Sequence, residues 1–439
     1  MKKFNYGAKG WGIVIFCFFL FWVGSGCPVT SLNVIMSEYN AMYGWDIAVL
    51  NGFGTMANIL SIIAAAVFGW WCKKRGPKSL ILAGCIMGAV SMFMWGRVTS
   101  IGTYALWYTI CVIASSAYCQ IGLASLIANW FPTRKGSVMG FVTVGACMVG
   151  LTYIKSQTFM IEHFSFAASF DLYAIAFVIL AVVCAFLVKS DPEQCGAYRD
   201  NNKNITPEVA KQMLEEEIKN KQTTVWTTGH IFKSRDFWFA AASCGLLIMG
   251  AVGTMTQSNA IISSFPELNY TIIMLMVAIF GAIGSWLLGV FDTRFGTKKS
   301  MIMAMILMIL SGVCGALATA TGTGALVVIA LIFVAMFMGA SSNFTVSVAA
   351  QYWRREDFSG VFACVNPVSN IFNAVAPTIV AILIASVMGV RAVFIFLLVA
   401  GIIGLILMLA FNGAHVKTVD DTYRKAAGKP LDDALVGRK

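Results

Sequence analysis

The stretch that decides the fold is Lys189-Ser190-Asp191-Pro192-Glu193-Gln194-Cys195-Gly196, a polar break between two long series of apolar segments. Hydrophobic residues make up 59% of the chain and charged residues 12%, whereas soluble domains carry about 25% charged residues. We therefore expect an all-α integral membrane protein.

Apolar segments of membrane-spanning length lie on both sides of this break. Crossing ~30 Å of hydrocarbon as a helix takes about 20 mostly apolar residues. The first set covers residues 11–35, 47–71, 80–95, 104–131, 138–159 and 167–188, and the second covers 237–265, 272–291, 301–320, 325–352, 361–386 and 393–411. The sequence thus predicts about twelve transmembrane helices in two six-helix halves.

The predicted domains follow from these segments. We expect an N-terminal half at 1–190, a cytoplasmic linker at 191–236, a C-terminal half at 237–412 and a cytoplasmic tail at 413–439. Within the linker, Thr206-Pro207-Glu208 has the pattern of an N-cap, a proline at the first helical position and an acidic first turn. This pattern predicts an amphipathic helix that ends near Lys221.

Lysine and arginine residues gather at one set of segment ends, which is the pattern of cytoplasmic loops. The opposite ends carry little beyond Arg97, Lys155 and Arg391. We therefore predict a multi-pass protein of the cytoplasmic (inner) membrane with both termini in the cytoplasm. Topology and anionic lipid headgroups account for the net charge of +11, so no nucleic-acid partner is expected.

The two halves repeat each other at nearly constant offset. Residues 69–78 lie over 289–298 at an offset of 220. At an offset of 223, Gln120 meets Asn343 and Trp130 meets Trp353, and near 226 Asn33 meets Asn259. Ordered matches of this kind indicate duplicated halves, and parallel halves place a substrate site near the membrane midplane between them.

The duplicated loops resemble the signature loops of the major facilitator superfamily. The second copy keeps Asp292 and Arg294, while the first has Lys73 where an acidic residue is usual. By this resemblance, gating roles fall to Lys73, Arg75, Gly76, Arg134, Asp292, Arg294 and Gly296.

Two short motifs are similar to those of oxalate/formate antiporter-type and monocarboxylate transporter-type carriers. These are residues 129–136, followed by Gly140 and Gly145, and Asp191-Pro192-Glu193 with Gly196. The resemblance implies alternating-access transport of a small mono- or dicarboxylate by exchange or proton symport. Several such carriers hold the carboxylate with a cation in the eighth and eleventh helices, and this sequence has none in the middle of either.

Lys155 is the strongest candidate for a substrate counter-charge, because an ionisable group in a spanning helix usually faces the protein interior. Thr152, Tyr153 and Ser156 lie beside it in the sequence. Two alternatives remain open: Lys155 could snorkel to the outer surface, or it could pair with Asp171.

Polar residues of other spanning segments complete the predicted site. Asn366, Asn370 and Asn373 share one helical face, flanked by Pro367 and Pro377, which would let the helix bend. Facing lipid would be costly, so the three amides line a cavity or hold neighbouring helices together. The other candidates are repeat-related or adjacent polar residues: Asn33, Tyr118, Gln120, Gln257, Asn259 and Asn343.

The residue inventory argues against an enzyme. The chain has three histidines, scattered at segment ends, and no nucleophile constellation, metal spacing or phosphate loop. We expect a monomeric secondary transporter without cofactor, whose partners are an organic anion, membrane lipid and either protons or a counter-anion. Alternatives are a carrier of larger amphipathic acids, such as sterol or aromatic acids, and a non-transporting membrane sensor.

Overall fold

The structure is a computed structural model that describes residues 6–132, 134–202, 208, 212, 215, 224–354, 356–429 and 431. In these residues all regular structure is helical, and eleven helices are long and apolar enough to cross a membrane. The predicted all-α membrane fold is therefore confirmed. Of the amphipathic helix predicted at 206–221, the structure describes only residues 208, 212 and 215, which are helical, and the other positions lie outside the described residues.

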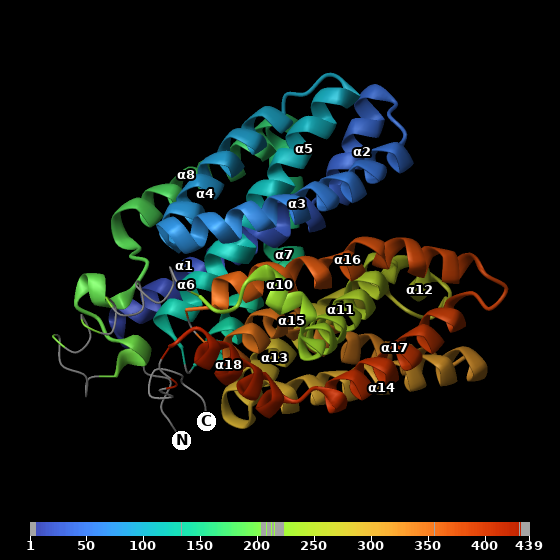
Figure 1. Ribbon diagram of the computed structural model, residues 1–439. Helices are drawn as coiled ribbons and strands as arrows, with labels where there is room; N and C mark the ends of the chain where they lie inside the picture. Colours follow the sequence, from blue (N-terminus) through green and yellow to red (C-terminus); the bar gives the residue numbers. More distant parts are fainter. Residues whose placement is uncertain are drawn as a thin grey trace. The chain divides into compact units, whose positions relative to one another are not determined.

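The chain divides into two compact units (Figure 1). Unit 1 comprises residues 1–133, 148–224 and 358–363, and unit 2 comprises 134–147, 225–357 and 364–439. Each unit thus includes a short strip of helix from the other half of the sequence. The two units are defined by packing and are not continuous in the chain, so they do not test the domain boundaries predicted near residues 190 and 237. These boundaries stay a prediction.

Unit 1 is built around a layer of neighbouring helices in which α4 lies between α5 and α8 (Figure 1). Its helices are α1 (Gly7–Ser25), α2 (Leu32–Tyr43), α3 (Ile47–Arg75), α4 (Pro77–Trp95), α5 (Ile101–Ser115), α6 (Leu123–Trp130), the second part of α7 (Lys135–His163) and α8 (Phe166–Leu187). Short 3-10 turns η3 (Pro192–Cys195) and η4 (Arg199–Asn201) follow.

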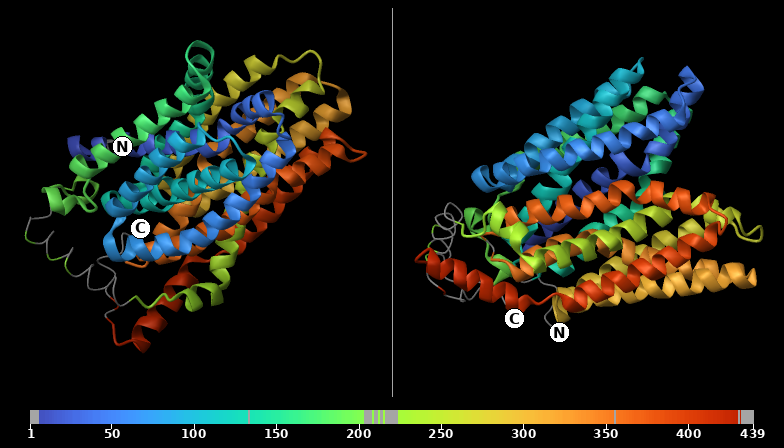
Figure 2. Two further views of the ribbon diagram at one scale, coloured as in Figure 1. Left: turned by 90° about the horizontal axis from the view of Figure 1, so that it is seen from above. Right: turned by 45° about the vertical axis from the view of Figure 1, so that its right-hand side comes forward.

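Unit 2 contains the remaining helices, among which α14 lies beside both α15 and α17 (Figures 1 and 2). They are the first part of α7, α10 (Thr228–Lys233), α11 (Arg235–Thr256), α12 (Ser258–Ser263), α13 (Tyr270–Phe295), α14 (Thr297–Thr321), α15 (Gly324–Tyr352), α16 (Phe358–Ala385), α17 (Val390–Ala410) and α18 (Gly413–Ala426).

Three predicted segments are not single regular helices. Segment 11–35 contains a π-helical stretch, η1 (Gly26–Thr30), between α1 and α2, and segment 104–131 contains η2 (Ser116–Gly122) between α5 and α6. Segment 237–265 breaks at Gln257, between α11 and α12. Hydropathy reports length and apolarity only, so it cannot distinguish an α-helical turn from a π-helical one.

The outward faces of spanning helices are apolar, as lipid requires. On α3 the exposed side chains Met56, Ile59, Ile63, Val67 and Trp70 recur every three or four residues. This spacing places them on one face of the helix. The helix ends in Lys73, Lys74 and Arg75, whose positive charges suit the C-terminal end of a helix dipole.

Two repeat-related glycines make close helix crossings. In unit 1, an added Cβ on Gly69 of α3 would lie 2.5 Å from the Cβ of Ala363 on α16. In unit 2, a Cβ on Gly289 of α13 would lie 2.6 Å from the Gly136 carbonyl oxygen and 2.8 Å from the Gly140 Cα on α7. Both crossings therefore need a residue without a side chain, at Gly69 on α3 and at Gly289 on α13. Each of these helices forms the second predicted transmembrane segment of its half of the sequence.

Repeat-related lysines also cap the sixth helix of each half. Lys78 Nζ donates to the Ala185 carbonyl at 2.7 Å, near the end of α8. Lys298 Nζ donates to the Phe411 carbonyl at 2.6 Å and to the Leu409 carbonyl at 3.1 Å, at the end of α17. A cation at these ends satisfies carbonyls that have no partner within the helix. We call this end of each unit its lysine-capped end.

Candidate functional site

Lys155 lies in the interior of α7, eight residues before the last residue of this helix, a depth of about 12 Å at 1.5 Å per residue. Its side chain is exposed. Elsewhere among the described spanning helices, every lysine and arginine lies within the first or last three residues of its helix. Among the lysines and arginines of these described helices, Lys155 therefore lies farthest from a helix end, and its role as a substrate counter-charge stays a prediction.

The predicted alternative partner of Lys155 is already engaged. Asp171, near the start of α8, receives two hydrogen bonds from Arg97, at 2.7 Å from Nη1 and 2.8 Å from Nη2. The same guanidinium lies 3.7 Å from the centroid of the Phe93 ring. The hydrogen bonds to Asp171 raise the pKa of Arg97. In the described part of the chain Lys155 has no ion pair.

An aromatic and polar cluster surrounds the turn of α7 that carries Lys155. The Tyr153 ring stacks on the Tyr173 ring of α8 with centroids 3.8 Å apart, and the Trp22 ring of α1 meets Tyr153 edge-on at 5.3 Å. Trp22 Nε1 donates to Thr152 Oγ1 at 2.8 Å. Ser156 Oγ and the Tyr173 hydroxyl are 2.6 Å apart. We call these residues the α7 aromatic cluster.

Several buried polar atoms near this cluster have no partner. Gln157, one turn after Tyr153 on α7, is 1% exposed, and both of its amide atoms lack a hydrogen bond within the described chain. The Tyr118 hydroxyl in η2 is buried and also unpartnered there. Unpaired buried polar groups cost free energy, and π-helical turns occur frequently at functional sites. Gln120 lies partly exposed in the same π-helical turn.

Sequence reasoning did not name Trp22, Tyr173 and Gln157 as candidate site residues. For Gln157 a signal existed, because an amide four residues after Tyr153 shares its helical face. Trp22 and Tyr173 belong to other helices and come to α7 only through folding.

The remaining predicted polar residues are spread over several elements of the structure. On α16, Asn366 is buried, whereas Asn370 and Asn373 are partly exposed, and Pro367 and Pro377 both lie inside the helix. Gln257 lies partly exposed at the break after α11, and Asn259 is exposed on α12. Asn33 lies on α2, and its side chain is outside the described part. No described contact joins the three asparagines of α16 to Gln257 or Asn259.

The predicted gating residues lie at the loops that join helices. Gly76 and Gly296 adopt φ of 79° and 90°, which favours glycine. The side chain of Asp292 is buried and accepts a hydrogen bond from Ser347 Oγ at 2.6 Å. Arg75 lies 5.9 Å from the Trp71 ring centroid and Arg294 lies 5.3 Å from that of Phe295. Lys73 and Arg134 are partly exposed.

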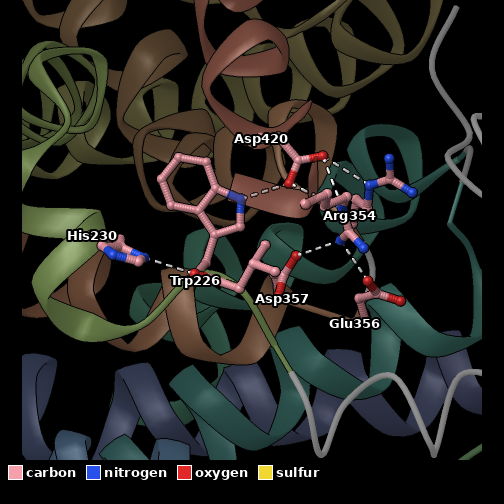
Figure 3. A network of polar contacts seen from close by, with 8 residues as sticks. Trp226, His230, Arg354, Glu356, Asp357 and Asp420 are labelled. Atoms are coloured by element: carbon pink, nitrogen blue, oxygen red, sulfur yellow. Dashed lines mark hydrogen bonds and ion pairs between the residues drawn. The ribbon is translucent and has the colours of Figure 1, made fainter. Parts of the chain in front are cut away.

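The tail predicted after the last span docks on unit 2 through a buried ionic network (Figure 3). Asp420 of α18 accepts hydrogen bonds from Arg354 Nε at 2.9 Å and from Trp226 Nε1 at 2.8 Å. Arg424 contacts Glu356 at 2.5 Å and Asp357 at 3.3 Å. We call these residues the α18 network.

In the α18 network, Asp420 and Arg424 each have neighbours that favour the ionised form. Burial acts to raise the pKa of Asp420, but the hydrogen bonds from Arg354 and Trp226 and the charge of Arg424 outweigh it, so this pKa is lowered. Burial acts to lower the pKa of Arg424, and its bond to Glu356 with the neighbouring carboxylates raises it overall. The ionised forms are therefore favoured in the folded protein.

Comparisons with known proteins bear on the fold. The family model described as Major Facilitator Superfamily matches residues 14–351 and 264–436, in two overlapping segments. A solved structure of the proton:xylose symporter XylE, bound to 6-bromo-6-deoxy-D-glucose, is similar with a TM-score of 0.70 at 14% identity, covering 91% of this chain and 94% of that chain. A double tryptophan mutant of XylE has a TM-score of 0.70 at 12% identity, covering 94% and 98%.

These structural matches show the fold alone. Comparison with curated protein sequences gave no match. The match to the family model confirms the superfamily part of the resemblance, and the oxalate/formate or monocarboxylate subtype stays a prediction.

Proposed function

Because the chain belongs to the major facilitator superfamily, we propose that it is a secondary active transporter that moves a small mono- or dicarboxylate across the cytoplasmic membrane by alternating access. The family fold is that of transporters, and no nucleotide-binding loop occurs in the sequence. A gradient is then the energy source.

The observation that carries the anionic substrate is Lys155. Lys155 is an exposed residue of α7 away from both ends of the helix, and no carboxylate pairs with it in the described part of the chain. An anion that leaves water loses hydration, and a nearby cation offsets this loss more strongly in a low dielectric than in water. Thr152, Ser156 and Gln157 supply hydrogen-bonding groups within one turn of Lys155.

Other polar groups complete the proposed substrate path. Tyr118 and Gln120 in η2, Asn33, Gln257 and Asn259, and the Asn366, Asn370 and Asn373 stripe remain proposals for substrate contact. Arg75, Gly76, Asp292 and Gly296 remain proposals for gating, together with Lys73, Arg134, Arg294, Pro367 and Pro377.

We favour exchange of one anion for another as the coupling mode. No aspartate or glutamate lies in the interior of α1, α5, α6, α11 or α15, where a buried proton carrier would be expected. Purified protein in liposomes should take up labelled substrate only when substrate is present inside. Uptake into empty liposomes driven by an imposed proton gradient would rule out obligatory exchange.

A ligand screen tests the substrate class. Ligand that binds only the folded state raises thermal stability by mass action. We expect mono- or dicarboxylates to raise the Tm of purified protein, and neutral sugars at equal concentration to leave it unchanged. A rise with sugars and none with carboxylates would contradict the proposal.

A larger aromatic acid is the second candidate substrate. The α7 aromatic cluster, with Trp22, Tyr153 and Tyr173 around the turn of α7 that carries Lys155, favours it because such rings pack against aromatic ligands. The same screen separates the two candidates if it includes benzoate-like and sterol acids. The Trp22→Ala variant should lose response to aromatic acids more than to small aliphatic ones.

A further inference from the structure

The short helix α10 contacts α11 in unit 2 (Figure 1), and two aromatic side chains are exposed at their junction. Phe232 is 41% exposed and Trp238 is 46% exposed, and their ring centroids are 5.8 Å apart. Trp238 Nε1 donates to the Phe232 carbonyl at 2.9 Å. Both rings pack edge-on against the buried Phe237 ring, each at a centroid distance of 5.3 Å. The two rings are therefore held in place from the inside, while part of their outer surface stays open.

Two exposed cations, Lys233 and Arg235, lie between these rings in the sequence. Lys233 has no ion pair in the described structure. Arg235 Nε lies 3.8 Å from Asp236 Oδ2, which is beyond hydrogen-bonding distance. The fully buried Asp236 carboxylate is instead bound by His415 Nδ1 at 2.6 Å and by the Asn412 backbone amide at 2.9 Å. The nearest carboxylate thus faces the interior. We call the four exposed residues of this junction the α10–α11 corner: Phe232, Lys233, Arg235 and Trp238.

The α10–α11 corner lies at the boundary between a spanning helix and water. Its residue Arg235 is the first residue of α11, a helix long and apolar enough to cross a membrane. The bond from the Asn412 amide to Asp236, just after the end of α17, places the corner at the lysine-capped end of unit 2. Tryptophan is enriched at membrane–water boundaries. The charge pattern of the sequence predicts that this end faces the cytoplasm, where the leaflet carries anionic lipids.

We propose that the α10–α11 corner binds an anionic phospholipid. Lys233 and Arg235 hold the phosphate group, and an acyl chain covers the exposed faces of Phe232 and Trp238. The combination of groups selects this ligand. A soluble anion would use the two cations and leave the rings in water, whereas a neutral lipid would cover the rings and leave the cations without a counter-charge. An anionic lipid satisfies both, because it buries apolar surface and brings a negative charge to the same place.

Other exposed cations at the lysine-capped ends differ from those of the corner. Lys74 Nζ lies 5.1 Å from the centroid of the Trp70 ring, and Arg294 Cζ lies 5.3 Å from that of the Phe295 ring. These cations rest on the aromatic rings of their own helices. In the described structure neither Lys233 nor Arg235 has such a ring contact. Their charges are therefore available to a ligand from outside the chain.

Thermal unfolding of the full-length purified protein in a neutral detergent tests this site without any organic substrate. Phosphatidylglycerol is titrated into the detergent, with phosphatidylcholine of the same acyl chains and glycerol 3-phosphate as comparisons at equal ionic strength. We expect Tm to rise along a saturating curve with phosphatidylglycerol, because a ligand of the folded state stabilises it. Neither comparison should reproduce the rise. An equal rise with phosphatidylcholine or with glycerol 3-phosphate would overturn the proposal, whatever the fate of the organic-anion proposal.

Fluorescence quenching locates the lipid. Lipids brominated on the acyl chain quench tryptophan at short range, and Trp238→Phe keeps an aromatic ring at the corner while it removes this tryptophan. We expect brominated phosphatidylglycerol to quench the wild-type protein more than brominated phosphatidylcholine does. The excess should disappear in Trp238→Phe. An excess of the same size in this variant would place the lipid elsewhere and overturn the proposal.

Charge-removing variants test the role of the two cations. Lys233→Gln and Arg235→Gln should each raise the half-saturating phosphatidylglycerol concentration about fivefold, the size expected for one basic residue near an anionic lipid surface. Both side chains are exposed, so the variants should fold. Lys425→Gln is the matched control, because Lys425 is an exposed lysine of unit 2 on α18. It should retain the wild-type response. An unchanged half-saturating concentration in the Lys233→Gln/Arg235→Gln double variant would overturn the proposal.

Discussion

At the lysine-capped ends of the two units, different bonds hold the chain segment that follows the last spanning helix of each half. In unit 1, the segment after α8 is held by Asn129 Nδ2, which donates to Asp191 at 3.0 Å, and by Trp130 Nε1, which donates to the Lys189 carbonyl at 2.9 Å. In unit 2, the segment after α17 forms α18 and docks through ionic bonds of Asp420. The repeated sequence reproduces the capping lysine, and the bonds that follow it have diverged.

The same divergence affects the helix crossings. The α3 crossing in unit 1 is formed by Gly69 against a methyl group of Ala363, so it contains no polar side chain at the contact. The α13 crossing in unit 2 places Gly289 against backbone of Gly136 and Gly140, and one turn earlier on α13 the Ser285 hydroxyl contacts the Thr143 hydroxyl of α7. The two repeat-related crossings therefore share the close approach of the helices, while a hydroxyl contact lies beside the α13 crossing.

Replacement of Asp420 in unit 2 and of Asp191 in unit 1 by asparagine should give the largest difference between the units in lost stability. Asp420→Asn leaves Arg354 and Arg424 without their shared carboxylate in a buried site, which costs about 3–5 kcal/mol. Asp191→Asn loses one charged hydrogen-bond acceptor and should cost about 1.5–3 kcal/mol. Tryptophan fluorescence during thermal unfolding measures both, since Trp226 bonds Asp420 directly. Asp421→Asn on the same helix is the control and should unfold like wild type.

The pH dependence of the α18 network has a defined sign. Because the pKa of Asp420 is lowered in the folded protein, its stabilising contribution is complete above its unfolded pKa of about 3.9 and is lost as pH falls through the lower folded pKa. We expect acid titration to release α18 in wild type. In Asp420→Asn, the stability of α18 should vary less with pH in this range.

A second substitution should recover stability lost at the α3 crossing, whereas none should recover it at the α13 crossing. Gly69→Ala and Gly289→Ala each overpack a helix contact, at a cost of about 1–3 kcal/mol. Adding Ala363→Gly removes the methyl group that Gly69→Ala meets and should recover part of the lost Tm. Gly289→Ala meets only backbone and glycine, so no side-chain truncation relieves it. Full additivity of Gly69→Ala and Ala363→Gly would show that the two residues are not in contact.

Substitution of the capping lysines should give the smallest loss of stability, and this loss should be nearly the same in the two units. Lys78→Met and Lys298→Met each remove a cation from the C-terminal end of a helix, worth about 0.3–1 kcal/mol. Equal small decreases in Tm would confirm that this part of the repeat is shared. A large loss for one lysine alone would show that the units also diverged here.

Hydropathy and internal repetition predict the membrane fold from the sequence, because both depend on local composition and order. The π-helical turns η1 and η2 could not be predicted, since their apolar pattern resembles that of an ordinary helix. The α18 network was equally hidden. Arg354 and Asp420 are 66 residues apart, and in the sequence Arg354 is one of many basic residues at segment ends, which the charge pattern explains by membrane topology.

The candidate site was only partly accessible to sequence reasoning. Lys155 stands out as a cation in an apolar segment, and the structure places it eight residues before the last residue of α7. Asp171, which the sequence offered as a possible partner of Lys155, is bound by Arg97, a residue that the sequence placed at a loop end. Contacts between helices such as Trp22 with Thr152 depend on packing, so no spacing within one helix could reveal them.

Uptake of the identified anion by Lys155 variants, normalised to the amount of protein in the membrane, tests the central proposal most directly. Lys155→Ala should abolish binding and uptake while folding stays intact, because removal of an ammonium from a spanning helix relieves an insertion cost. Lys155→Arg should retain part of the activity, since the charge survives with a different geometry. Lys135→Ala provides a comparison at the other end of α7. A near-normal uptake rate in Lys155→Ala would contradict the account and show that this lysine only extends toward the membrane surface.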